Sequence, residues 1–178
     1  MKKTKKVIGL GVLFLTAAAP VTVLAHATLE QQKAAVGSSY KAVIKVPHGC
    51  GSEPTLRLRV QVPDGMVSVK PMQKPGWQLD VVKKSYDKAY QYRRGVSLTE
   101  GVGEIKWTGK LSNDDYDEFV FVGYLSDTLK PDTVLYFPVI QECEKGSERW
   151  IEIPAEGKTS RDYRFPAPGL KLMLPSSN

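Results

Sequence analysis

Thr55-Leu-Arg-Leu-Arg-Val-Gln-Val62 is the stretch that decides the fold. Every second side chain from Leu56 to Val62 is apolar, and the side chains between them are polar. Successive side chains of a strand point to opposite faces, so this period of two predicts a half-buried β-strand. Pro63-Asp64-Gly65 follows at once and has the chemistry of a turn.

Similar signals recur along the chain. Phe119–Leu125 is nearly continuously apolar, which is typical of a central strand. Pro138 interrupts an apolar stretch and predicts an edge strand or a bulge there. The stretch 86–92 is ambiguous between strand and loop, and 166–174 is expected to add a late strand or to lie extended. With the opening stretch, eight strands are expected, the others being at 39–46, 66–70, 78–83, 103–109, 119–125, 134–140 and 147–153.

The strand count and the turn signals indicate the fold class. No long amphipathic helix and no repeated unit is evident, and around eight short strands in one domain predict an all-β sandwich. An immunoglobulin-like or fibronectin-like β-sandwich is expected, with a jelly roll as the main alternative. Trp107, in an alternating stretch, is expected between the sheets, whereas Trp77 and Trp150 lie near strand ends and could wall a site.

The first 25 residues have the features of a secretory signal peptide. Four lysines precede the apolar run 7–19, and Val23-Leu24-Ala25 presents small residues before a cleavage point. The alternative is a membrane anchor, but the apolar run is short for a membrane span. We therefore expect a signal peptide at 1–25, one β-sandwich domain at 26–178, a periplasmic location and no stable membrane span after cleavage.

Cleavage also changes the charge of the protein. The whole chain has a formal net charge of +6, and removing the four signal lysines, with no acid beside them, leaves +2. Nucleic-acid binding calls for a concentrated basic face, which this balance does not indicate. About 150 residues remain, the size of one domain with a substantial core.

The chain has two cysteines, Cys50 and Cys143, widely separated in sequence. In an exported protein a disulfide is the default expectation. The alternative is a pair of thiolate ligands for a soft metal, although the spacing lacks a CxxC motif.

His26 follows Ala25 and becomes the first residue once the signal peptide is removed. A free α-amine and the Nδ1 of the same imidazole can close a chelate on one metal ion. Nitrogen donors in a tetragonal arrangement suit Cu(II), which heads the divalent affinity order. The alternative is that His26 only marks the point of cleavage.

His48 and Glu53 share the loop Val46-Pro-His-Gly-Cys-Gly-Ser-Glu-Pro-Thr55. If the start of the mature chain meets this loop, His48 could share a metal with His26, and Glu53 could add an oxygen ligand. The alternative is an ordinary turn histidine beside a disulfide. The sequence has no GxSxG, HExxH or phosphate-binding glycine loop, so an enzyme is not expected.

The same residues resemble the YcnI-like family of exported copper-binding domains, most closely its Gram-negative members with two cysteines. The resemblance covers the mature chain in order. It rests on His26-Ala-Thr-Leu-Glu30, Val46-Pro-His-Gly-Cys50, Lys74-Pro-Gly-Trp77, Asp117-Glu-Phe119, Phe137-Pro-Val-Ile-Gln-Glu-Cys143, Trp150-Ile-Glu-Ile-Pro154 and Pro166-Ala-Pro168.

The resemblance implies an immunoglobulin-like or fibronectin-like sandwich that binds Cu(II) through a brace formed by the amino-terminal histidine, here His26. A glutamate adds an oxygen ligand in the family, and a tryptophan, matched here by Trp150, lies close to the metal. The family's glutamate position falls near Arg57 in this sequence, where an arginine cannot be a ligand. Glu53 is the nearest acid, and with His48 included the site would resemble a two-histidine brace.

The resulting functional hypothesis is a copper-binding protein of periplasmic copper homeostasis or trafficking, acting as a chaperone or store. The resemblance suggests another periplasmic copper carrier or an inner-membrane copper importer as partner. Two alternatives are an oxidative copper enzyme with a histidine brace and a metal-free β-sandwich interaction module.

Overall fold

The structure, a computed structural model, describes residues 26–175. The predicted signal peptide, 1–25, lies outside these residues. The described part contains the strands β1 Thr28–Leu29, β2 Lys33–Ala35, β3 Ser39–Val46, β4 Thr55–Gln61, β5 Met66–Pro71, β6 Gln78–Tyr92, β7 Val96–Leu111, β8 Asp117–Leu125, β9 Val134–Tyr136, β10 Val139–Cys143, β11 Ser147–Trp150 and β12 Gly169–Met173, with short 3-10 turns at Arg93–Gly95 and Ser160–Asp162.

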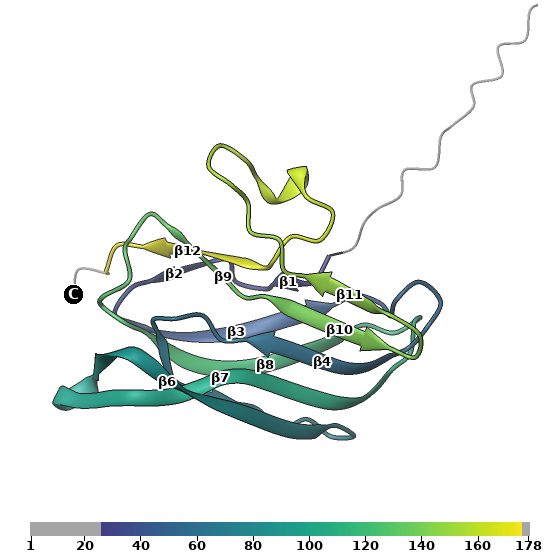
Figure 1. Ribbon diagram of the computed structural model, residues 1–178, viewed down its shortest axis with the longest axis horizontal. Coiled ribbons are helices and arrows are strands. Elements are labelled where there is room, and N and C mark those ends of the chain that lie inside the picture. The colour runs from purple at the N-terminus through teal and green to yellow at the C-terminus, as the bar shows by residue number, and fades with distance from the viewer. Residues whose placement is uncertain (1–25, 176–178) are drawn as a thin grey trace, which may run out of the picture.

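The strands form two large antiparallel sheets and one small sheet (Figure 1). One large sheet has the order β1-β3-β8-β5, and the other has the order β11-β10-β4-β7-β6. The small sheet has the order β2-β12-β9, with β12 parallel to β2 and antiparallel to β9. The expected all-β sandwich is confirmed.

Side chains from both large sheets share one core. Ile44 of β3 and Phe119 of β8 belong to the same buried cluster as Leu58 of β4 and Trp107 of β7. Trp107 is fully buried and its ring lies 5.4 Å from that of Phe119, as measured between centroids. The prediction that Trp107 lies between the sheets is therefore confirmed.

The alternation that predicted β4 is confirmed over most of its length. Leu58 and Val60 are fully buried, whereas Arg57 and Gln61 are exposed. The register with β7 shifts between Thr55 and Arg57, and Thr55 is buried at the start of the strand. A polar residue thereby enters the core at the end of the strand nearest the 47–54 loop.

The stretch 134–140 differs from its prediction, because it forms two strands in different sheets. β9 pairs with β12, while β10 pairs with both β4 and β11. Pro138 lies between them and has no N–H to continue a ladder. Its carbonyl accepts a hydrogen bond from Gln61 N at 2.9 Å, and Phe137 N donates to Pro168 O at 2.8 Å. The expected edge position applies only to β9.

β6 and β7 form a hairpin much longer than the sequence predicted. The ambiguous stretch 86–92 belongs to β6, and the Arg93–Gly95 turn joins the two strands. Figure 1 shows the hairpin extending past the sandwich at the lower left. Tyr86 and Tyr90 contact each other edge-on at 5.1 Å between ring centroids.

The segment 151–168 projects from the sandwich between β11 and β12 (Figure 1). Its two ends are held together, because Glu152 N donates to Phe165 O at 3.0 Å and Ala167 N donates to Glu152 O at 2.8 Å. The late strand expected within 166–174 is confirmed as β12. No helix within residues 26–175 is long and apolar enough to cross a membrane.

Candidate metal centre

His26 lies two residues before β1, an edge strand of the four-stranded sheet. β1 pairs antiparallel with β3, with Thr28 opposite Lys45 and Leu29 opposite Ile44. Ala27 and Leu29 are buried in the core, so they anchor the start of the mature chain. The local alternation thus places His26 at a defined position on the sandwich.

The ring of His26 contacts the ring of Trp150. Their centroids are 5.4 Å apart and their planes are 87° from parallel, an edge-to-face arrangement. Trp150 is 3% exposed and also contacts Phe165 at 5.4 Å between centroids. Edge-to-face packing is a favourable geometry for aromatic rings and restricts how the imidazole can turn.

One nitrogen of the His26 imidazole has an unusual environment. Nε2 is buried and has no hydrogen-bond partner. A buried polar atom without a partner typically costs about 1–3 kcal/mol, because it has lost water without replacement. A chelate by the amine and Nδ1 of His26 does not use Nε2, so the environment of this atom describes the packing of the ring and not its donor atoms.

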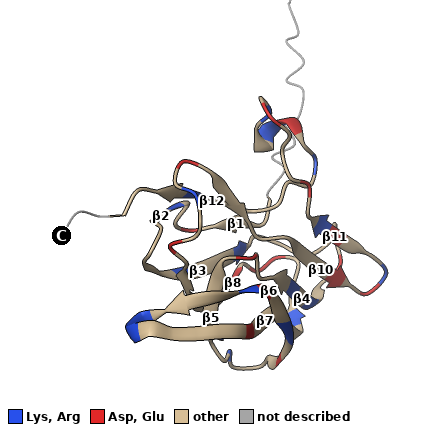
Figure 2. Ribbon diagram, turned by 60° about the vertical axis from the view of Figure 1, so that its left-hand side comes forward, with Lys and Arg blue, Asp and Glu red and all other residues tan. Residues whose placement is uncertain are grey.

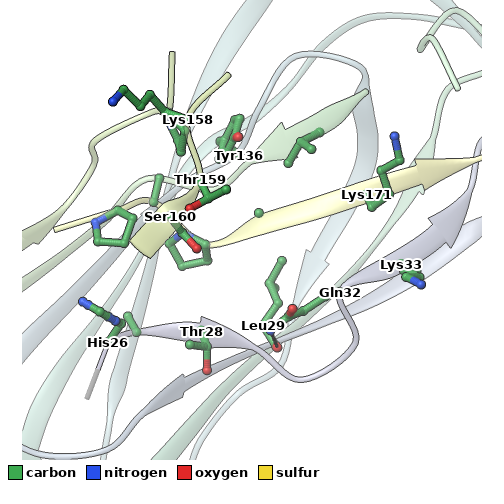
Figure 3. Close-up of a pocket in the computed structure, with 17 residues that line it drawn as sticks. His26, Thr28, Leu29, Gln32, Lys33, Tyr136, Lys158, Thr159, Ser160 and Lys171 are labelled. Carbon is green, nitrogen blue, oxygen red and sulfur yellow. Dashed lines mark hydrogen bonds between the residues drawn. The ribbon is translucent and has the colours of Figure 1, made fainter. Parts of the chain in front are cut away.

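A cavity of about 420 Å³ adjoins His26. Figure 3 shows Leu29 pointing from β1 toward β12, with Thr159 and Ser160 of the 151–168 segment above His26. The lining also includes three prolines, two alanines and three lysines. The cavity gives a small ligand room beside the imidazole.

Gln141 connects Trp150 to the loop that carries His48. Its side chain is 1% exposed and accepts a hydrogen bond from Trp150 Nε1 at 3.3 Å. Its Nε2 donates to His48 O at 2.6 Å and to Thr55 Oγ1 at 2.7 Å. Sequence reasoning missed this residue. The available signal was a glutamine two positions after Val139, on the face of β10 that points into the core.

Cys50 and Cys143 form the predicted disulfide, with 6.1 Å between their Cα atoms. Both cysteines of the chain are used in it. The alternative, a pair of thiolate ligands, is therefore wrong for this oxidised state. Cys50 Sγ also lies 3.7 Å from Gln141 O, so the bridge holds the 47–54 loop against β10.

His48 and Glu53 lie in that same loop. The Nδ1 atom of His48 faces the carbonyl oxygen of Gly49. Glu53 Oε2 accepts a hydrogen bond from Lys145 N at 2.8 Å, and its other oxygen lies 3.7 Å from Lys145 Nζ. The carboxylate of Glu53 thus caps the turn between β10 and β11.

Arg57, at the position expected for the family's glutamate, lies on the outer face of the five-stranded sheet. Its guanidinium pairs with Glu142 at 2.8 Å, and Arg59 pairs with both Glu142 and Glu104. Figure 2 shows basic and acidic positions interspersed along the ribbons of β4, β10 and β11. Arg57 therefore belongs to a surface ion-pair network.

Between residues 26 and 175 no group of three or more His, Cys, Asp or Glu side chains is arranged to hold a metal ion. The structure brings the ring of His26 together with that of Trp150. His48 and Glu53 share one loop because they are close in the sequence, and Gln141 is hydrogen-bonded to both Trp150 and the carbonyl of His48. A chelate formed by the amine and the ring of His26 needs only one residue, so the absence of such a three-residue group does not bear on it.

A sequence model of the family described as "Domain of unknown function (DUF1775)" matches residues 26–172. The chain belongs to this family. DUF1775 corresponds to the YcnI-like family. No curated protein matches the chain in sequence.

The fold has a counterpart among solved structures. The chain is similar to an uncharacterized protein from Nocardia farcinica whose crystal structure reveals an immunoglobulin-like fold. The TM-score is 0.58 at 21% sequence identity, over 83% of this chain and 98% of that one. At this identity the similarity shows the fold alone, and it confirms the immunoglobulin-like expectation. Copper binding at His26 stays a prediction from the sequence.

Proposed function

We propose that this member of the DUF1775 family is exported, begins at His26 after signal cleavage and binds one Cu(II) ion through the amine and Nδ1 of that residue. It acts in periplasmic copper homeostasis or trafficking, as a chaperone or store. In this proposal the ion is the cargo, and the protein acts as a carrier or store and not as an enzyme.

The placement of His26 is the observation that supports this proposal. Its ring is restrained by Trp150 and lies beside a cavity of about 420 Å³. Restraint of the ring reduces the entropy lost on binding.

The donor set of His26 suits Cu(II). An amine and an imidazole nitrogen are among the ligands that Cu(II) prefers in a tetragonal arrangement. Trp150 would form an apolar wall beside the ion. His48 and Glu53 are the proposed further ligands, although Oε2 of Glu53 already accepts a hydrogen bond from the backbone N–H of Lys145.

The proposed partners are the copper ion itself and a second copper protein, either a periplasmic carrier or an inner-membrane importer. The cavity beside His26 offers an approach for a small chelator or for the ligand-bearing segment of a partner. Exchange of the ion between proteins would then occur at the start of β1.

The decisive experiment compares the mature protein starting at His26 with a form carrying one extra alanine ahead of it. The extension replaces the amine with an amide and leaves every side chain in place. We expect tight Cu(II) binding, measured by competition with a chromogenic chelator, only for the unextended form. A form with one alanine added after Asn178 serves as the matched control.

Electron paramagnetic resonance of the same samples counts the nitrogen ligands. Equal affinity and equal spectra for the extended and unextended forms would exclude the brace. Unchanged melting temperature with Cu(II) would favour the metal-free interaction module, since a ligand of the folded state raises that temperature. Reductant-dependent oxygen consumption by the loaded protein would favour the copper enzyme.

A further inference from the structure

The amide of Gln141 is buried, and both its oxygen and its nitrogen have hydrogen-bond partners. It lies in β10, where Val139 is opposite Trp150 and Gln141 is opposite Glu148. Gln141 and Trp150 are therefore diagonal neighbours on one face of the sheet, within reach of long side chains. Burial of an amide is tolerated because hydrogen bonds replace its water.

The chemistry of the partners fixes the orientation of this amide. The indole N–H of Trp150 can only donate, so the atom 3.3 Å from it must be the oxygen Oε1. The carbonyl of His48 can only accept, so the atom 2.6 Å from it must be the nitrogen Nε2. A carboxylate or an apolar side chain at position 141 cannot satisfy both partners.

Two further contacts join the 47–54 loop and its neighbour Thr55 to β10. Thr55 Oγ1 accepts the second hydrogen of the amide at 2.7 Å, and Thr55 is itself fully buried. The Cys50–Cys143 disulfide lies beside Gln141, with Cys50 Sγ 3.7 Å from Gln141 O. The loop holding His48 and the strand holding Gln141 are thereby fastened together.

The contacts continue from Gln141 to the start of the mature chain. Trp150 is held at its N–H by Gln141, and the ring of Trp150 meets the ring of His26 at 5.4 Å. We propose that Gln141 is a positioning residue for His26, acting through the indole of Trp150. The effect of Gln141 on Cu(II) binding rests on the proposed function. Its effect on the position of the His26 ring rests on these contacts alone.

The test uses the mature protein starting at His26 with Gln141→Met, which keeps a side chain of similar length without hydrogen bonds. In the metal-free protein, the His26 ring proton resonances should move toward those of an unrestrained histidine, because the neighbouring indole is released. Cu(II) affinity should fall about 10–100-fold, as is usual when a residue supporting a metal ligand is lost. The lines of the Cu(II) electron paramagnetic resonance spectrum should broaden, because the His26 ring samples more orientations.

Thr55→Val is the matched control, because it removes one partner of the same amide and leaves the bond to Trp150. It should lower stability but leave the His26 resonances and the Cu(II) spectrum as in the unaltered protein. Unchanged His26 resonances in Gln141→Met would overturn the positioning role. Equal changes in both variants would also overturn it, since they would reflect general loosening.

A measurement on the unaltered protein covers the case in which Gln141→Met does not fold. The indole N–H of Trp150 should exchange slowly with solvent deuterium, and fast exchange would overturn the proposal. The two proposals fail separately. Absence of Cu(II) binding by the unaltered protein would refute the function, whereas the His26 resonances would still decide the role of Gln141.

Discussion

Cys50 and Cys143 join segments that are 93 residues apart in the chain, with their Cα atoms 6.1 Å from each other. The bridge connects the 47–54 loop to the end of β10, next to Gln141. It therefore supports the region from which the contacts leading to His26 begin.

Reduction of this disulfide should strongly destabilise the protein. Closing a loop of this length corresponds to about 4–5 kcal/mol in the chain-entropy model. We expect the free energy of unfolding in urea to fall by up to this amount when dithiothreitol is added. A Cys50→Ser, Cys143→Ser double variant should show the same loss without responding to dithiothreitol. Equal stability of the oxidised and fully reduced forms would contradict the prediction.

Replacement of Trp150 by phenylalanine should lower the free energy of unfolding by more than the loss of buried ring area alone predicts. The variant leaves Oε1 of Gln141 buried without its donor, a cost of about 1–3 kcal/mol. A double-mutant cycle of Trp150→Phe and Gln141→Met, followed by urea unfolding, measures the free energy of this interaction. The double variant should lose less stability than the sum of the single variants, because the unsatisfied oxygen is gone. Simple additivity would show that the bond contributes nothing.

Acid should remove a stabilising contribution of Glu104. Burial raises the pKa of this carboxyl, but the hydrogen bonds and charges of Arg59 and Lys106 together lower it below its ordinary value of 4.5. As pH falls, the unfolded chain binds the proton first, so the contribution is present above pH 4.5 and is lost below it.

Glu104→Gln should therefore be less stable at neutral pH and less sensitive to acid. Its melting temperature should fall less steeply than that of the unaltered protein between about pH 5 and pH 3. Glu100→Gln, which removes an exposed partner of Lys83, is the control and should follow the unaltered protein. Parallel melting curves for Glu104→Gln and the unaltered protein across this range would count against the prediction.

Gly109 on β7 leaves space for the ring of Trp77. A Cβ at this position would lie 2.5 Å from Trp77 Cδ2, so alanine must displace the indole from its contact with Phe119. We expect a loss of about 1–3 kcal/mol by urea unfolding, the usual cost of overpacking. Gly146→Ala is the control, because a Cβ there meets no atom within 4 Å. Equal stability of the two variants would disprove the close approach.

Local sequence patterns were sufficient for most of the fold. The period of two in β3 and β4 predicted both strands, because alternation records which face is buried. The disulfide followed from the number of cysteines and the expected compartment. The length of the β6–β7 hairpin was missed, since Tyr86–Tyr92 is polar and its strand structure depends on pairing with β7. The division at Pro138 was also missed, because the sheet that each half joins is decided by distant strands.

The sequence by itself determined the strands with clear alternation, such as β3 and β4, and it predicts His26 as the start of the mature chain. It also singled out Trp150, through the family resemblance. Only the tertiary structure decided that these two rings touch, that Glu53 is bonded to Lys145, and that Gln141 links Trp150 to His48. The physical reason is that alternation specifies which face of a strand is buried, whereas contacts between side chains depend on the register and packing of strands far apart in the chain.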